Sequence, residues 1–154
     1  TFSNCELVMT GNYSFGTGFL NIHQDVVLKA PEQLTETSII FEYSSINPLT
    51  INAESQLKVD DNTTFKYNVA NLADMLVFTN KSSVLRLNHC TFESATTGGC
   101  RLKKGRLVID DKVVFKSATG SDSDSIKLTS TSLDIDVLSG GVIDVQQGYV
   151  EYEG

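Results

Sequence analysis

The sequence predicts an all-β protein, a single-stranded right-handed parallel β-helix (β-solenoid). Three observations predict it. A short pattern of alternating apolar residues recurs along the chain, on both sides of a polar bend. No stretch longer than one or two turns has helical character. The Asn-Gly turns that would join the hairpins of a β-sandwich are absent from the sequence. Short, similar strands separated by polar corners are instead typical of a solenoid, in which each turn buries the next.

The recurring pattern has two apolar residues in alternation, a three-residue corner and two more apolar residues. It fits six segments, two of them with a shorter corner, which begin at Leu7, Leu20, Leu57, Leu85, Leu107 and Ile143. The middle three starts are 28 and 22 residues apart (85 − 57 and 107 − 85), which suits one turn of a three-sided coil. The strand-like runs 38–43, 75–78, 125–128 and 133–137 are expected to supply the third side. Only 31–34 and 68–73 lack strand-like alternation.

Composition sets limits on size and partners. The 154 residues, 40% of them apolar, are enough for one continuous core, so we expect a single β-solenoid domain over 1–154. A net charge of −7, from 12 basic and 19 acidic residues, argues against nucleic acid as a partner. No apolar run is long enough to span a membrane, and the first residues, from Thr1 on, do not form an apolar signal region. We expect a mature product or a fragment of a larger repeat protein.

Two small groups of residues leave alternatives open. Arg101, Lys103, Lys104 and Arg106 form a basic cluster that suits an acidic ligand or, more simply, a solvated edge. The three cysteines, Cys5, Cys90 and Cys100, form no CxxC pair. Cys90 and Cys100 are close enough in sequence for a disulfide between adjacent strands, and buried free thiols fit equally well.

A family resemblance rests on residues 96–110, on 133–141 and on 148–150. These strings resemble the repeats of large β-solenoid proteins predicted at the surface of intracellular bacteria that live in protists. More broadly they are similar to right-handed parallel β-helices such as autotransporter passengers and the pectin-lyase-like fold, although the passengers' signature repeats are absent. The resemblance covers residues 55–154 well and the first third loosely. It implies a secreted or cell-surface protein, usually without assigned activity.

Pectin-lyase-like enzymes, by resemblance, use carboxylates on one sheet to hold calcium or as acid and base. The candidates here are Asp60, Asp61, Asp110, Asp111, Asp134, Asp136 and Asp144. Asp and Asn also suit the corner between two strands, because they tolerate left-handed backbone and hydrogen-bond their own main chain. We therefore expect Asp60, Asn88 and Asp110 to form a corner column, and Asp134 and Asp136 to lie on a solvated face.

Other candidate side chains also have a structural interpretation. His23 and His89 share the corner position of the pattern, and no nucleophile motif accompanies them. The polar stretch 120–125 lacks the Glu and central Gly of a calcium loop. Tyr13, Phe15, Phe65, Phe92 and Phe115 occupy inward positions and predict a core stack, which leaves Tyr43, Tyr67, Tyr149 and Tyr152 for surface contacts.

The expected function is a structural or adhesive segment of a secreted or cell-surface protein, with no catalytic, cofactor or metal site. Because the end turns of a solenoid have unpaired backbone groups, other chains should associate end to end or side by side. A host-surface glycan or protein is a further expected partner. The alternative is a β-helix that binds or cleaves polysaccharide, such as a lyase, a hydrolase or a tailspike-like trimer. An enzyme should bring three or more acidic groups together with Arg86, Arg101 or Arg106 in one lateral groove.

Overall fold

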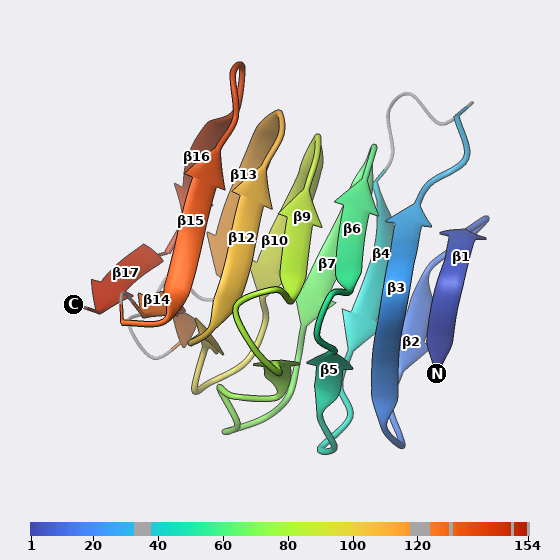
Figure 1. The fold of residues 1–154 in the computed structure, drawn as a ribbon, viewed down its shortest axis with the longest axis horizontal. Helices are drawn as coiled ribbons and strands as arrows, with labels where there is room; N and C mark the ends of the chain where they lie inside the picture. The colour runs from blue at the N-terminus through green and yellow to red at the C-terminus, as the bar shows by residue number, and fades with distance from the viewer. Residues whose placement is uncertain (33–37, 118–123, 130, 149, 154) are drawn as a thin grey trace.

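The chain folds into a parallel β-solenoid of about five turns, as predicted (Figure 1). The computed structural model describes residues 1–32, 38–117, 124–129, 131–148 and 150–153. Each turn runs up the front of the view in Figure 1, down the back and one step further from the N-terminus, which is a right-handed coil. Strands make up most of the described ranges, and none of these residues forms an α-helix or a helix able to span a membrane.

The front side of the coil is formed by six strands of an eight-stranded sheet, whose other two strands lie on the third side. Its strands are paired in parallel, each with its counterpart in the next turn. In chain order the front strands are β1 (Phe2–Val8), β3 (Leu20–Lys29), β6 (Gln56–Asp60), β9 (Val84–Leu87), β12 (Gly105–Ile109) and β15 (Leu133–Val137). We call this side the front sheet.

The back sheet has six strands in the same order along the axis. They are β2 (Tyr13–Phe15), β4 (Ile39–Tyr43), β7 (Thr63–Tyr67), β10 (Cys90–Ser94), β13 (Lys112–Ser117) and β16 (Val142–Gln147). A corner joins each front strand to the following back strand. Asn62 and His89 occupy two of these corners with φ of 52° and 45°, in the left-handed region. Their backbones are also bonded, because the Asn62 amide donates to the His89 carbonyl at 3.1 Å.

The third side of the coil is divided into two parts. The first half of β3 pairs with β5 (Leu49–Ile51), which pairs with β8 (Leu76–Phe78). A separate three-stranded sheet then continues this side, with β11 (Cys100–Leu102), β14 (Ile126–Thr129) and β17 (Val150–Glu153). Among the described residues no strand pairing joins β8 to β11, so the ladder is interrupted once.

The core is a set of like-on-like columns, because parallel pairing places equivalent residues of successive turns above one another. The predicted one-turn spacing is confirmed, since Leu57 pairs with Leu85 and Leu85 with Leu107. An aromatic column is formed by Tyr13, Phe41, Phe65, Phe92 and Phe115, with ring centroids 5.4–5.9 Å apart. Phe15 stacks on Tyr43 in the neighbouring column, at 5.8 Å.

Several segments occupy a different side of the coil from the one predicted. In the segment that begins at Leu20, the bend joins the third side to the front sheet, because Leu20 pairs with Leu49 while Leu28 pairs with Val59. The segment that begins at Ile143 bends from the back sheet to the third side. Residues 38–43 and 133–137 were expected on the third side, but they form β4 and β15 of the back and front sheets. Alternation is identical on all three sides, so it does not reveal the side.

The remaining predicted third-side runs are confirmed. Residues 75–78 contain β8, and residues 125–128 contain most of β14. The two stretches without alternation, as far as the structure describes them, contain turns and no strand.

Replacing Phe92 with alanine should be strongly destabilising, because its ring is fully buried between Phe65 and Phe115. We expect Phe92→Ala to lower the free energy of unfolding by about 3–5 kcal/mol in a urea titration. Tyr13→Ala is the matched control in the same column, because the Tyr13 side chain is 50% exposed. Its loss should be less than half as large, and equal losses for the two variants would contradict a continuous buried column.

Candidate functional site

The acidic corner column lies at the junction of the front and back sheets, as predicted. Val59 pairs with Leu87 and Leu87 with Ile109, which places Asp60, Asn88 and Asp110 one above another just after these strands. The Asn88 side-chain amide donates to Asp60 Oδ1 at 2.5 Å. The two carboxylates of the column are therefore separated by a neutral amide that bonds to one of them.

Two basic side chains on the front sheet, Lys58 and Arg86, neutralise both carboxylates. Lys58 Nζ lies 2.6 Å from Asp60 Oδ2. Arg86 binds Asp110 through two parallel hydrogen bonds, from Nε at 2.5 Å and from its terminal nitrogen at 2.9 Å. Burial raises the pKa of Asp60, but the hydrogen bonds from Lys58 and Asn88 outweigh burial, so its pKa is below the ordinary 3.8.

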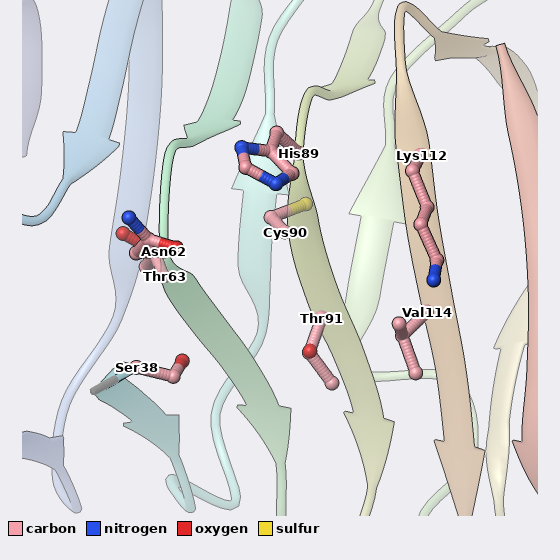
Figure 2. Close-up of a pocket in the computed structure, with 8 residues that line it drawn as sticks. All are labelled: Ser38, Asn62, Thr63, His89, Cys90, Thr91, Lys112 and Val114. Carbon is pink, nitrogen blue, oxygen red and sulfur yellow. The ribbon is translucent and has the colours of Figure 1, made fainter. Parts of the chain in front are cut away.

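A shallow hollow of 210 Å³ opens beside this corner, on the outer face of the back sheet. Figure 2 shows the side chains from successive turns that surround it, most of them polar: Ser38, Asn62, Thr63, His89, Thr91 and Lys112, together with Cys90 and Val114. The His89 ring is exposed, with Nδ1 3.7 Å from Asp61 Oδ1. Lys112 Nζ lies 3.2 Å from Asp144 Oδ2. Hydroxyl, amide and imidazole groups therefore line an open surface that suits hydrogen bonding to a polar ligand.

The two histidines do not share a corner, contrary to the prediction. His89 lies between β9 and β10, whereas His23 lies within β3, at the bend from the third side to the front sheet. His23 Nε2 is 3.3 Å from the Asn52 side-chain amide. The sequence pattern gave the two histidines the same position because it depends only on the alternation of apolar residues, which does not show on which side of the coil a bend lies.

The remaining acidic candidates are dispersed. Asp61, Asp111 and Asp134 are exposed, and Asp136 forms an ion pair with Arg106. In the part of the chain that the structure describes, no group of three His, Cys, Asp or Glu side chains is placed to hold a metal ion. The polar stretch 120–125 lies mostly outside the described residues.

The basic cluster of the sequence is divided by a corner of the coil. Arg101 lies on the third side, where Arg101 and Lys103 both contact Asp74, while Arg106 lies on the front sheet. Arg86, Arg101 and Arg106 thus each approach a different carboxylate, those of Asp110, Asp74 and Asp136.

Two tyrosines expected at the surface are core residues. Tyr43 and Tyr67 are fully buried, and their hydroxyls donate to the backbone carbonyls of Asn47 and Leu72. Inward-facing tyrosine needs such a partner for its hydroxyl. Tyr152 is exposed as predicted, and Tyr149 lies outside the described residues.

The cysteines are free thiols. Cys90 lies on the back sheet and Cys100 on the third side, so they do not occupy adjacent strands as a disulfide would require. Burial raises the pKa of the Cys90 thiol to about 12 and also raises that of Cys100. Cys90 is therefore protonated at neutral pH, although it lines the hollow beside His89, and it lacks the thiolate that a nucleophile needs.

No protein-family model, curated protein or solved structure matches this chain. The parallel β-solenoid architecture is shown by the structure itself. The relation to surface proteins of intracellular bacteria remains a prediction from the sequence.

Removing the Asp60 carboxylate should destabilise the fold in a pH-dependent way. Asp60→Ala leaves Lys58 and Asn88 without their acceptor, so we expect a loss of about 1–3 kcal/mol at pH 7 in a urea titration. Because the folded pKa is depressed, this contribution is complete above the ordinary value of 3.8 and is lost as the pH falls through the folded pKa. The wild-type advantage should therefore shrink in acid. Asp61→Ala, at the exposed neighbour, should change stability by less than about 0.5 kcal/mol, and equal effects would rule out the column as a stabilising element.

Thiol labelling should separate the three cysteines. Cys90 and Cys100 are buried, whereas Cys5 is partly exposed on β1. Iodoacetamide at neutral pH should modify Cys5 first and should modify Cys90 and Cys100 only after urea unfolds the chain, as read by mass spectrometry of peptides. Rapid labelling of native Cys90 would show that its thiol is open and activated by His89.

Proposed function

We propose that this chain is a rigid, non-catalytic structural or adhesive segment of a secreted or cell-surface β-solenoid protein, and that its end turns pair with further β-solenoid turns, which in the isolated chain would be those of a second copy. One observation carries the proposal: both ends of the coil present apolar side chains beside strand edges.

The C-terminal end is the more apolar of the two. The last strands of the three sides are β15, β16 and β17. Their exposed apolar side chains include Val137, Val142, Ile143, Val145 and Tyr152, with exposed fractions from 37% to 68%. Exposed apolar groups beside an unpaired strand edge are the usual signature of a surface that pairs with another chain.

The N-terminal end offers a complementary surface. An apolar cleft of 210 Å³ is lined there by Phe2, Leu7, Met9, Tyr13 and Phe41. Leu7 heads the column that runs through Leu28, Val59, Leu87 and Ile109 to Val137. Val145 pairs with Phe115 below the aromatic column that Tyr13 heads. A second copy that continues the coil in register would place its Leu7 on Val137 and its Tyr13 on Val145.

The lateral faces support a spacer role. Their charges are largely arranged in pairs between successive turns, as in Glu6–Lys29, Arg86–Asp110, Arg106–Asp136 and Lys127–Glu151. The net charge of −7 opposes side-by-side contact between copies and disfavours nucleic acid as a partner. Association at the ends is therefore favoured over association at the sides.

A polysaccharide-binding or polysaccharide-cleaving β-helix is the alternative function. The hollow beside His89 favours it, because hydroxyl and amide side chains of the kind that bind sugar line that surface (Figure 2). Cleavage is the weaker part of this alternative, since Arg86, Arg101 and Arg106 each contact a different carboxylate among the described residues. Measured cleavage of any glycan in a panel would overturn the non-catalytic proposal.

Sedimentation velocity tests the end contact. The wild-type chain should show mass that rises with concentration, whereas Val145→Lys should remain a monomer because its ammonium would be buried against the next copy. Val114→Lys is the matched control, because Val114 projects from the lateral face of the back sheet. It should associate like the wild type. A wild-type monomer at every concentration, or equal loss in both variants, would contradict end-to-end association.

A further inference from the structure

A second apolar surface lies on the side of the coil, away from both ends. It is a groove of 190 Å³ at the interruption between β8 and β11. The side chains of β8 line it together with Arg101, Lys103 and Lys104. Leu76 and Phe78 are buried, while Val77 is partly exposed and points outward between them.

Unequal turn lengths account for the groove. The turn from Leu57 to Leu85 spans 28 residues and the next, from Leu85 to Leu107, spans 22. The shorter turn is reduced at two corners: five residues instead of eight separate its back strand from the third side, and only Lys103 and Lys104 separate β11 from β12, whereas five residues separate β8 from β9. A shorter turn encloses less area, so β11 is not aligned with β8. One backbone hydrogen bond from the Arg101 amide to the Ala73 carbonyl, at 2.8 Å, remains near this step.

The groove is positively charged on a negatively charged protein. Asp74 is the one carboxylate that lines it, with Oδ2 2.7 Å from Lys103 Nζ and Oδ1 3.6 Å from Arg101. Within the described residues Lys104 forms no ion pair, and its side chain is exposed. Lys103 and Lys104 against the single carboxylate of Asp74 leave an excess of positive charge at this edge, on a chain whose net charge is −7. Both Lys103 and Lys104 belong to the short corner that produces the groove.

We propose that this groove binds an acidic peptide segment of a partner protein, with an apolar side chain packed against Val77 and carboxylates bound by Lys103 and Lys104. Charge complementarity selects an acidic partner, because the cations outnumber the single resident carboxylate. The apolar lining selects a peptide over a sulfated glycan, since a polyanionic sugar would use the cations and leave Val77 uncovered. Asp74 occupies the place of one partner carboxylate and competes with it. This lateral site is independent of the end contact of the proposed function.

Peptide titration of the whole ¹⁵N-labelled chain, followed by NMR chemical shifts, tests the inference. The probe is the blocked peptide Glu-Glu-Leu-Glu-Glu, with Glu-Glu-Gly-Glu-Glu and Lys-Lys-Leu-Lys-Lys as comparisons. The leucine peptide should shift the amides of β8 and β11 and bind at least tenfold more tightly than either comparison. A sulfated heparin oligosaccharide should bind at least tenfold more weakly. Equal binding of the glycine peptide or tighter binding of the sulfated oligosaccharide would overturn the inference.

Variants separate this groove from general charge attraction. Lys104→Glu should weaken binding of the leucine peptide at least fivefold. Lys81→Glu makes the same charge change at an exposed corner and should alter the affinity less than twofold. Asp74→Asn should tighten binding at least threefold, because it removes the competing carboxylate. Equal loss in Lys104→Glu and Lys81→Glu, or weaker binding by a folded Asp74→Asn, would overturn the assignment. Each titration is carried out on a chain that also carries Val145→Lys, which should remain a monomer. A failure of peptide binding can then be distinguished from a failure of end-to-end association.

Discussion

The structure depends on the parallel backbone ladder, which holds equivalent residues of successive turns directly above one another. This spacing brings side chains of the same type into contact and makes each turn part of the core of the next. The aromatic column from Tyr13 to Phe115 is the clearest result, since five rings from five turns stack with centroids no more than 5.9 Å apart. Stability is therefore distributed along the axis, and each interior turn is supported from both sides.

The same ladder would bring like charges into contact if every turn carried the same charged residue at a given position. On the surface, the residue at an equivalent position differs from one turn to the next. Asn88 separates the carboxylates of Asp60 and Asp110, and Lys58 and Arg86 on the adjacent row neutralise them. The lateral surface therefore carries many ion pairs between successive turns and little uncompensated charge. The apolar ends and the basic groove are the places where this pairing of charges stops, so they are the surfaces best suited to contact another chain.

The number of residues in each turn also shapes the coil. A solenoid tolerates turns of 28 and 22 residues because corners change length while the strands keep their register. The front and back sheets continue through the short turn without interruption. The third side does not, and its short corner in this turn consists of the two lysines of the groove. An irregularity in the repeat thus produces a local surface that a regular coil would lack.

The sequence by itself determined the all-β coil, the register of Leu57, Leu85 and Leu107, the acidic corner column and most of the aromatic stack, in which Phe41 takes the place predicted for Phe15. Each follows from spacing between neighbouring turns, which residue order records directly. Only the tertiary structure decided which side of the coil each strand occupies, because alternation is the same on every side. The shared frame assumed for His23 and His89 and the third-side placement of 38–43 and 133–137 failed for this reason. The surface position of Tyr43 and Tyr67 failed for another: both alternate in phase with a buried phenylalanine, and a backbone carbonyl accepts from each hydroxyl inside the coil. The groove beside Val77 was equally invisible, since it exists only where two turns of unequal length meet.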